Sequence, residues 1–363
     1  MGALPNAQIV PDFKSPFFIR SHIVSDLTLE DIARLAGVSR STVSRVINNH
    51  PSVRGSVRTR VLEVIQNTGF HPNLAARALV SKCSGMIGLV VPRSVTSFFT
   101  DPYFPFLTQG IAQACNQHNL TLGFFLVSTK EDEDKIFPRV SRKGYLDGII
   151  VQSGQIGEGL IERLNNAEIP LVIAGRPLQP EHLSYVDVDN VTAAAIAVSH
   201  LISLGHQRIA TITGPVDNTV GIDRRAGYEQ ALAQHGIPME SELIVAGDFT
   251  ETGGYAAMKR LLPARPRAVF AASDGMAIGA MRAIQSVGLR VPQDIAVVGF
   301  DDLPMPTPPT PLLTTMRQPI QGFGVRAVEV LIDLIENGNL PPRKVIMTAE
   351  LIIRDSCGSA QTH

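Results

Sequence analysis

The sequence predicts an α/β protein with an all-α helix-turn-helix headpiece at its N-terminus and a two-lobed core of doubly wound parallel sheets. Residues 27–49, LTLEDIARLAGVSRSTVSRVINN, contain two short amphipathic helix patterns separated by a turn. From Met86 onward, apolar runs typical of buried strands alternate with amphipathic helices, which is the pattern of parallel βαβ units. With 363 residues, the chain is long enough for two or three domains.

Helix-capping residues define the two helices of the headpiece. Thr28 is a good N-cap, and Asp31 completes an acidic form of the capping box three residues later. Gly37 follows the last turn of the first helix, where a left-handed residue commonly ends a helix. Ser39 is a second N-cap, so a second helix is expected over residues 40–48.

Arginines and hydroxyls occupy the outer face of this second helix. They lie in its first two turns, the end that approaches base edges when such a helix enters the major groove of DNA. Arginine can bind guanine O6 and N7 through two hydrogen bonds, whereas hydroxyls near a helix N-terminus suit phosphate. The alternative is an ordinary pair of surface helices with solvated charges. The helix caps, the glycine in the turn and the polar face of the second helix all agree with DNA binding instead. The residues concerned are Arg40, Ser41, Thr42, Ser44 and Arg45.

Charge is unevenly distributed along the chain. Residues 40–82 hold seven basic residues and a single acid, Glu63, although the whole chain has a net charge of −1. A basic head on an acidic body is the electrostatic footprint of a nucleic-acid-binding module.

Composition argues against several other classes of protein. The cysteines Cys83, Cys115 and Cys357 are widely spaced, which disfavours a disulfide framework and fits a reducing cytoplasm. No run reaches the roughly 18 apolar residues of a membrane helix, so no membrane partner is expected. Residues 1–25 lack the pattern of a signal peptide and are expected to be a poorly ordered extension. No metal-ligand cluster or cofactor motif stands out, and neither a metal nor a cofactor is expected.

The core pattern runs twice, first from Met86 and again after Val186, which predicts two lobes. Strands are expected over 86–92, 120–127, 145–153, 169–175, 208–214, 243–249, 268–273 and 295–302. Helices are expected over 56–68, 110–117, 200–205, 224–236 and 276–288. Ligands of such sheets bind at the carboxyl ends of the strands. Those ends carry Pro92, Gln152, Arg176, Gly214, Phe249, Ser273 and Asp301. The proline-rich segment 302–315 is expected to be a stiff crossover between the lobes.

The chain closely resembles the LacI/GalR family of bacterial transcription repressors over roughly residues 27–355. The motifs that carry the resemblance are LEDIARLAGVSRSTVSRVIN, HPNLAARAL, IGLVVP, HLISLGHQRIATITGP, SDGMAIGAMRAI and GLRVPQDIAVVGFDD. The resemblance implies a helix-turn-helix headpiece, a hinge helix and a core like that of periplasmic sugar-binding proteins. The implied domains are a headpiece over 26–72, a hinge over 73–85, a first lobe over 86–187 and 320–344, a second lobe over 188–319 and 345–357, and a tail over 358–363.

For the headpiece and hinge, the resemblance implies contacts to operator DNA. Arg40 and Ser41 match base-reading positions of the family, and Arg45 matches a frequent arginine. The further DNA-binding residues expected are Thr28, Ser39, Thr42, Asn48, Arg54, Asn73, Ala76 and Leu79. Leu79 would be an apolar wedge in the minor groove, with simple linker packing as the alternative.

For the core, the resemblance implies a small-molecule effector between the lobes. The expected effector residues are Tyr103, Phe104, Gln152, Asn218, Arg224, Phe249, Ser273 and Asp301. Aromatic rings, an arginine and a carboxylate together suit a polyhydroxylated ring, so a sugar is the first choice and its identity stays open. Taken singly, Phe249 could be core, and Arg224 could pair with an acid on its own helix. Ser273 stands where many members carry asparagine, and Asn218 and Val220 disfavour a purine.

Three functions compete on the sequence. The first is a ligand-controlled repressor that binds a pseudo-palindromic operator as a homodimer. The second is a solute-binding protein, which the basic headpiece disfavours. The third is an enzyme, for which no phosphate-binding loop, nucleophile set or metal cluster is found. The nine residues after Arg354 lack a heptad pattern, so a dimer is expected rather than a tetramer.

Overall fold

The computed structural model of the protein describes residues 27–47, 50–70, 83–152, 159–304 and 308–359. The chain forms two compact units, Met1–Arg77 and Ala78–His363. The predicted extension over 1–25 lies outside the described residues, as do Asn48, Asn73, Ala76 and Leu79.

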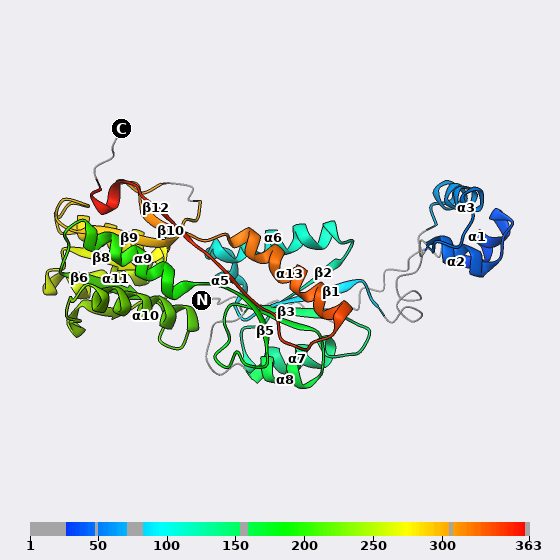
Figure 1. The fold of residues 1–363 in the computed structure, drawn as a ribbon, viewed down its shortest axis with the longest axis horizontal. Helices are drawn as coiled ribbons and strands as arrows, with labels where there is room; N and C mark the ends of the chain where they lie inside the picture. The colour runs from blue at the N-terminus through cyan, green and yellow to red at the C-terminus, as the bar shows by residue number, and fades with distance from the viewer. Residues whose placement is uncertain (1–26, 48–49, 71–82, 153–158, 305–307, 360–363) are drawn as a thin grey trace, which may run out of the picture. The chain divides into compact units, whose positions relative to one another are not determined.

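Three helices form the headpiece: α1 (Leu29–Ala36), α2 (Arg40–Ile47) and α3 (Gly55–Thr68) (Figure 1). The predicted capping box is confirmed, because the Asp31 N–H donates to Thr28 Oγ1 at 3.2 Å and the Thr28 N–H donates to Asp31 Oδ2 at 3.0 Å. Gly37 ends α1 at φ 62°, and the Ser39 hydroxyl accepts from the Thr42 N–H at 3.2 Å. The small core that the three helices share consists of Ile32, Ala33, Ala36, Val43, Val46, Val61 and Phe70.

The first lobe of the second unit is a six-stranded parallel sheet in the order β11-β5-β4-β3-β1-β2. Its strands are β1 (Met86–Val91), β2 (Thr121–Leu126), β3 (Gly148–Gln152), β4 (Leu171–Ala174), β5 (Ser184–Val188) and β11 (Lys344–Met347). Its helices are α5 (Val95–Thr100), α6 (Tyr103–Gln117), α7 (Lys130–Val140), α8 (Gly159–Asn166) and α13 (Ile320–Asn337). In Figure 1, α6 and α13 cover one face of this sheet, and α7 and α8 cover the other.

The second lobe is a six-stranded sheet in the order β12-β10-β9-β8-β6-β7. Its strands are β6 (Ile209–Thr213), β7 (Ile244–Ala246), β8 (Ala268–Ala271), β9 (Ala296–Asp301), β10 (Thr314–Arg317) and β12 (Glu350–Ile352). Its helices are α9 (Asn190–Ser203), α10 (Thr219–Gln234), α11 (Glu251–Leu261) and α12 (Asp274–Ser286), with short 3-10 turns η1 (Ser241–Leu243), η2 (Leu262–Ala264) and η3 (Asp355–Cys357). The predicted parallel arrangement holds except for β12, which pairs antiparallel with β10 at the edge of the sheet.

Glycines allow close contacts between neighbouring helices in each lobe. A Cβ atom on Gly110 of α6 would lie 2.0 Å from the carbonyl oxygen of Gln321 in α13. A Cβ atom on Gly227 of α10 would lie 2.2 Å from the Val191 carbonyl oxygen in α9. Both helix pairs therefore depend on a missing side chain. Among the described residues, the helices are too short or too polar to cross a membrane.

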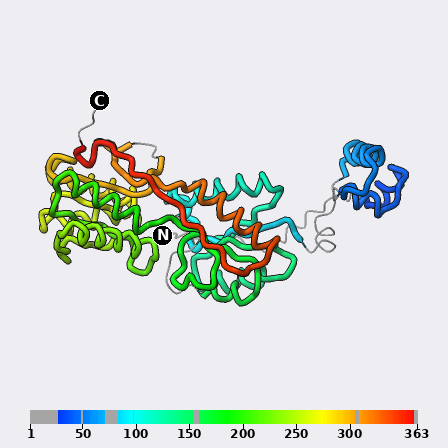
Figure 2. The backbone as a smooth tube through the Cα atoms, viewed as in Figure 1, coloured from blue at the N-terminus to red at the C-terminus, as the bar shows by residue number. Residues whose placement is uncertain are grey.

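The chain passes between the lobes three times: from β5 to α9, from β10 to α13, and from β11 to β12. Figure 2 shows the last passage as a red stretch of tube that runs from one lobe to the other. The predicted boundary between the two lobes at residues 344 and 345 is wrong. β11 pairs with β5, so the first lobe extends to Met347.

The proline-rich segment over 302–315 was expected to cross between lobes, and this expectation is wrong. It joins β9 to β10, which are neighbouring strands of the same sheet. The crossing that follows in the chain falls after Arg317 instead, where Gln318 and Pro319 lead into α13.

Candidate DNA-binding surface and effector site

The outer face of α2 presents its polar side chains to solvent. Arg40, Ser41 and Arg45 are exposed. Arg40 Nε lies 3.0 Å from Glu30 Oε1, and both side chains stay more than half exposed, at 66% and 61%. An exposed ion pair of this kind contributes about 0–1 kcal/mol, so Arg40 can exchange Glu30 for a base or phosphate at little cost.

Hydroxyl groups gather at the N-terminus of α2. Ser39 Oγ lies 2.9 Å from both Ser41 Oγ and Thr42 Oγ1. This end of a helix carries free N–H groups and a partial positive charge, which favours a phosphate oxygen. Thr28 differs, because its hydroxyl donates to Asp31 Oδ2 at 2.7 Å and serves the cap of α1. Arg54 is exposed just before α3.

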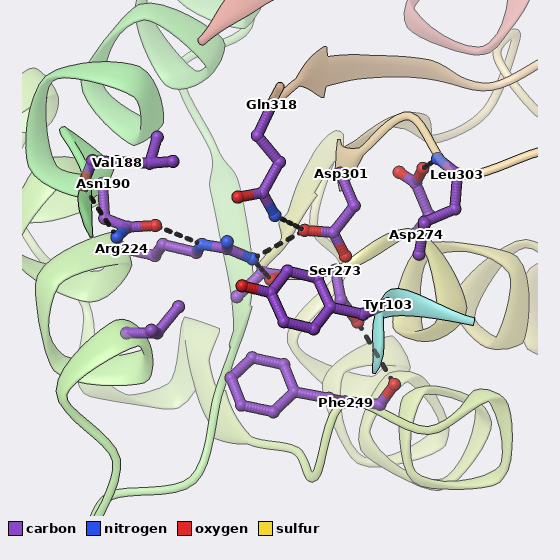
Figure 3. A network of polar contacts seen from close by, with 12 residues as sticks. Tyr103, Val188, Asn190, Arg224, Phe249, Ser273, Asp274, Asp301, Leu303 and Gln318 are labelled. Carbon is purple, nitrogen blue, oxygen red and sulfur yellow. Dashed lines mark hydrogen bonds and ion pairs between the residues drawn. The ribbon is translucent and has the colours of Figure 1, made fainter. Parts of the chain in front are cut away.

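In the second unit, Arg224 of α10 is the centre of a buried polar network (Figure 3). Its Nε donates to Asn190 Oδ1 at 2.9 Å, and its Nη1 donates to the Ala272 carbonyl oxygen at 2.6 Å. The same Nη1 lies 3.2 Å from Asp301 Oδ1. The guanidinium carbon lies 3.5 Å from the ring centroid of Phe300, a cation–π contact. Arg224 is therefore held rigidly, and it pairs with an acid of β9 rather than with one on its own helix.

Asp301 ends β9 and receives a second donor from a lobe crossover. Gln318 Nε2 donates to its Oδ1 at 2.6 Å. Burial raises the pKa of Asp301 to about 6, although Arg224 lowers it. Asp301 at φ 125° and Phe249 at φ 67° are non-glycine residues with positive φ. Backbone strain of this kind clusters at functional sites.

Tyr103 and Phe104 follow the first strand together, but the structure separates their side chains. Tyr103 lies beside the Arg224 network in Figure 3. Burial, Asp187 and Asp301 all raise the pKa of its phenol. The Phe104 ring is 4% exposed and belongs to the core of the first lobe, where the Arg93 guanidinium lies 5.4 Å from its centroid.

Phe249 and the two predicted polar residues nearby lie at the ends of the second sheet. A Cβ atom on Gly214 would lie 2.3 Å from the Phe249 ring, so this glycine makes room for the aromatic side chain. The Ser273 hydroxyl accepts from the Met276 N–H at 3.2 Å and caps α12. The Asn218 side-chain oxygen accepts from the Val220 N–H at 2.9 Å and caps α10. Both polar groups are thus engaged with helix ends.

Gln152 ends β3 and is half-buried. No hydrogen bond described in the structure joins it to the Arg224 network, so its place in the effector site stays a prediction.

Sequence reasoning missed several polar residues at the lobe crossovers. Asp187, Asn190 and Gln318 flank two crossovers and are at most 8% exposed. Arg176 was expected at a strand end and does follow β4, but its bidentate ion pair with Asp223 of α10 was not predicted. The run DVDN, which ends β5 and leads into α9, was the available signal, because strand ends line the cleft in this fold. Among the described residues, no group of His, Cys, Asp and Glu side chains is arranged to hold a metal ion.

Comparison with known proteins gives two family matches. Residues 28–73 match the model described as bacterial regulatory proteins of the lacI family, and residues 198–357 match a periplasmic binding protein-like domain. The chain is 36% identical to the HTH-type transcriptional regulator CelR of Thermobifida fusca, over 91% of this chain and 98% of that protein. It is 33% identical to the ribose operon repressor of Escherichia coli strain K12, over 91% and 99% of the two chains.

Solved structures agree with these matches. A transcriptional regulator CelR–cellobiose complex is similar at a TM-score of 0.73 with 34% identity, covering 91% of this chain and 99% of that one. The lac repressor dimer bound to operator and the anti-inducer ONPF is similar at a TM-score of 0.78 with 26% identity, over the same 91% and 99%.

Proposed function

Because this chain belongs to the LacI family of bacterial DNA-binding transcription regulators, we propose that it is a repressor controlled by a sugar or polyol bound between its core lobes. Members of this family are regulators rather than enzymes, and they act in the bacterial cytoplasm.

The buried Arg224–Asp301 pair is the main observation that supports a sugar or polyol as the effector. It offers fixed donors and acceptors at the carboxyl ends of strands, where ligands of parallel sheets bind. Tyr103 and Phe249 add rings beside it, and aromatic faces suit the apolar faces of a sugar ring. The solved CelR relative holds cellobiose, which supports a neutral sugar here.

Dimerisation is the second part of the proposal. A pseudo-palindromic operator requires two headpieces related by a two-fold axis, and the lac repressor relative was solved as an operator-bound dimer. The first lobe has an open sheet edge at β2, where Phe124 is 40% exposed, and Phe99 of α5 is 69% exposed. A strand edge flanked by exposed aromatic rings suits burial against a second copy.

Coupling between effector and DNA would run through lobe closure. An effector that contacts both lobes favours one degree of closure, and so shifts the spacing of the two hinges in the dimer. The Arg176–Asp223 ion pair joins the lobes and would respond to such a change.

Operator binding by the full-length protein tests the proposal. Fluorescence anisotropy on DNA from upstream of its own gene should show specific binding that weakens steeply with salt. Neutral sugars that raise the melting temperature should also change this affinity. Specific binding that no stabilising sugar alters would refute the effector part while leaving DNA binding in place.

A further inference from the structure

Asp187 is a buried carboxylate at the carboxyl end of β5, directly before the crossover into α9. It is 5% exposed. In the described part of the chain, its side-chain hydrogen bond is a long one of 3.4 Å from Asn190 Nδ2, an amide that donates a shorter bond of 3.0 Å to the Val188 carbonyl oxygen. The backbone of Val188 gives it one further bond. A carboxylate offers about four acceptor positions, so Asp187 keeps capacity for other donors.

The two nearby guanidinium groups are already committed to other carboxylates. Arg176 gives Nε and Nη2 to Asp223 at 2.9 and 2.7 Å. Arg224 is bonded to Asn190, Ala272 and Asp301. Burial, together with the neighbouring charge of Asp223, raises the pKa of Asp187 to about 7. A buried carboxylate with so few partners is costly, and retaining it suggests a role in binding.

Asn190 links Asp187 to the site described above. Its Nδ2 lies 3.4 Å from Asp187 Oδ1, and its Oδ1 accepts a hydrogen bond from Arg224 Nε at 2.9 Å. Asp187 of the first lobe is therefore joined through one amide side chain to the Arg224–Asp301 pair of the second lobe. A ligand beside this network would meet acceptors from both lobes.

We propose that Asp187 is a specificity-determining residue of the effector site, whose carboxylate accepts hydrogen bonds from hydroxyl groups of a neutral sugar or polyol. This inference rests on the proposed function, in which the effector is a sugar or polyol, and it assigns to one first-lobe residue the choice among such ligands. Because Arg176 and Arg224 are paired with Asp223 and Asp301, neither guanidinium group is left to neutralise an anionic ligand beside Asp187. A sugar acid or sugar phosphate would place a second negative charge beside it, so neutral ligands are favoured.

Isothermal titration of the full-length protein tests this with a panel of neutral mono- and disaccharides, including glucose and cellobiose, and with glucuronate and glucose 6-phosphate. The variant Asp187→Asn keeps the shape of the side chain and removes its charge. It should bind the preferred neutral sugar roughly 10- to 100-fold more weakly, since hydrogen bonds to a charged acceptor are the stronger ones. The variant should also show a smaller difference in affinity between neutral and anionic ligands than the wild type does.

Asp217→Asn is the matched control, because Asp217 is an exposed carboxylate in the loop before α10. It should bind like the wild type. A neutral sugar that binds wild type and Asp187→Asn equally, with unchanged selectivity, would overturn the inference and leave the proposed function intact. If no neutral sugar of the panel binds the wild type, the effector class and the inference both fail.

Discussion

Arg176 and Asp223 join the two core lobes through a bidentate ion pair, with Nε–Oδ2 and Nη2–Oδ1 distances of 2.9 and 2.7 Å. Arg176 follows β4 of the first lobe, and Asp223 lies on α10 of the second. The Thr219 hydroxyl adds a third link by donating to the Arg176 carbonyl oxygen at 2.8 Å. The guanidinium is 28% exposed and the carboxylate 13%, so solvent screens the pair only partly.

Asp223→Asn is expected to loosen lobe closure. It removes the charge that holds Arg176 and should lower the free energy of unfolding by about 1 kcal/mol. Small-angle scattering of the ligand-free protein should give a larger radius of gyration than for the wild type. The control is Glu229→Gln, which breaks the exposed Arg225–Glu229 pair on the same helix. Equal radii for all three proteins would show that the pair does not restrain the lobes.

Arg224→Met is expected to destabilise the core and abolish the effector response. It leaves Asp301 buried without its cation, which typically costs about 3–5 kcal/mol. Adding Asp301→Asn should recover part of the stability, but not effector binding. Urea unfolding measures the first effect, and titration with a sugar that binds the wild type measures the second. If Arg224→Met is as stable as the wild type, the Arg224–Asp301 pair does not stabilise the fold.

Asp187→Asn is expected to change how stability depends on pH. The folded pKa of about 7 lies above the ordinary 3.8, so between these values the native state holds a proton that the unfolded state has lost. The contribution of Asp187 to stability therefore falls as the pH rises from about 4 to 7, by up to roughly 1.4 kcal/mol per unit. The groups acting on it are Asp223, Arg176 and Arg224, besides its coupling to Tyr103 and Tyr185.

Urea unfolding at pH 4.5 and pH 8 tests this pH dependence. The variant should gain stability over the wild type at pH 8 and lose that advantage at pH 4.5. A difference between the two proteins that is the same at both pH values would contradict the raised pKa of the buried Asp187 carboxyl group.

Arg40→Ala is expected to relax operator specificity at one base pair by about 1–3 kcal/mol. When Arg40 contacts DNA, it gives up the exposed ion pair with Glu30 described above. Competition between operator and random DNA in an anisotropy assay measures the change. Arg34→Ala is the control, because Arg34 is an exposed arginine on α1. Equal losses on operator and random DNA would make Arg40 a phosphate contact.

Local patterns were sufficient to predict the headpiece helices and the succession of strands and helices along the chain. The capping box at Thr28 and Asp31 and the left-handed Gly37 depend on neighbours within a few residues, which sequence displays directly. The strand patterns likewise placed Asp301 at the end of a strand, whereas Arg224, which lies on α10, was named only from the resemblance to the family.

Contacts between distant segments were harder to predict. Gln318 reaches Asp301 because β10 pairs beside β9, with Arg317 in register with Asp301. Arg176 reaches Asp223 because the two lobes meet there. The proline-rich segment resembled a crossover by composition, but strand pairing decides where the chain crosses. Phe104 was predicted with Tyr103, yet adjacent residues on a helix point about 100° apart, and its ring entered the core.

Effector-dependent operator binding decides whether this protein is a sugar-controlled repressor. The operator affinity of the full-length protein would be measured by anisotropy at fixed salt, with and without a saturating neutral sugar that raises its melting temperature. If the sugar controls this repressor, its binding should change the operator affinity by about tenfold or more, and Arg224→Met should abolish this change while retaining DNA binding. An operator affinity that stays the same with the sugar bound would contradict it.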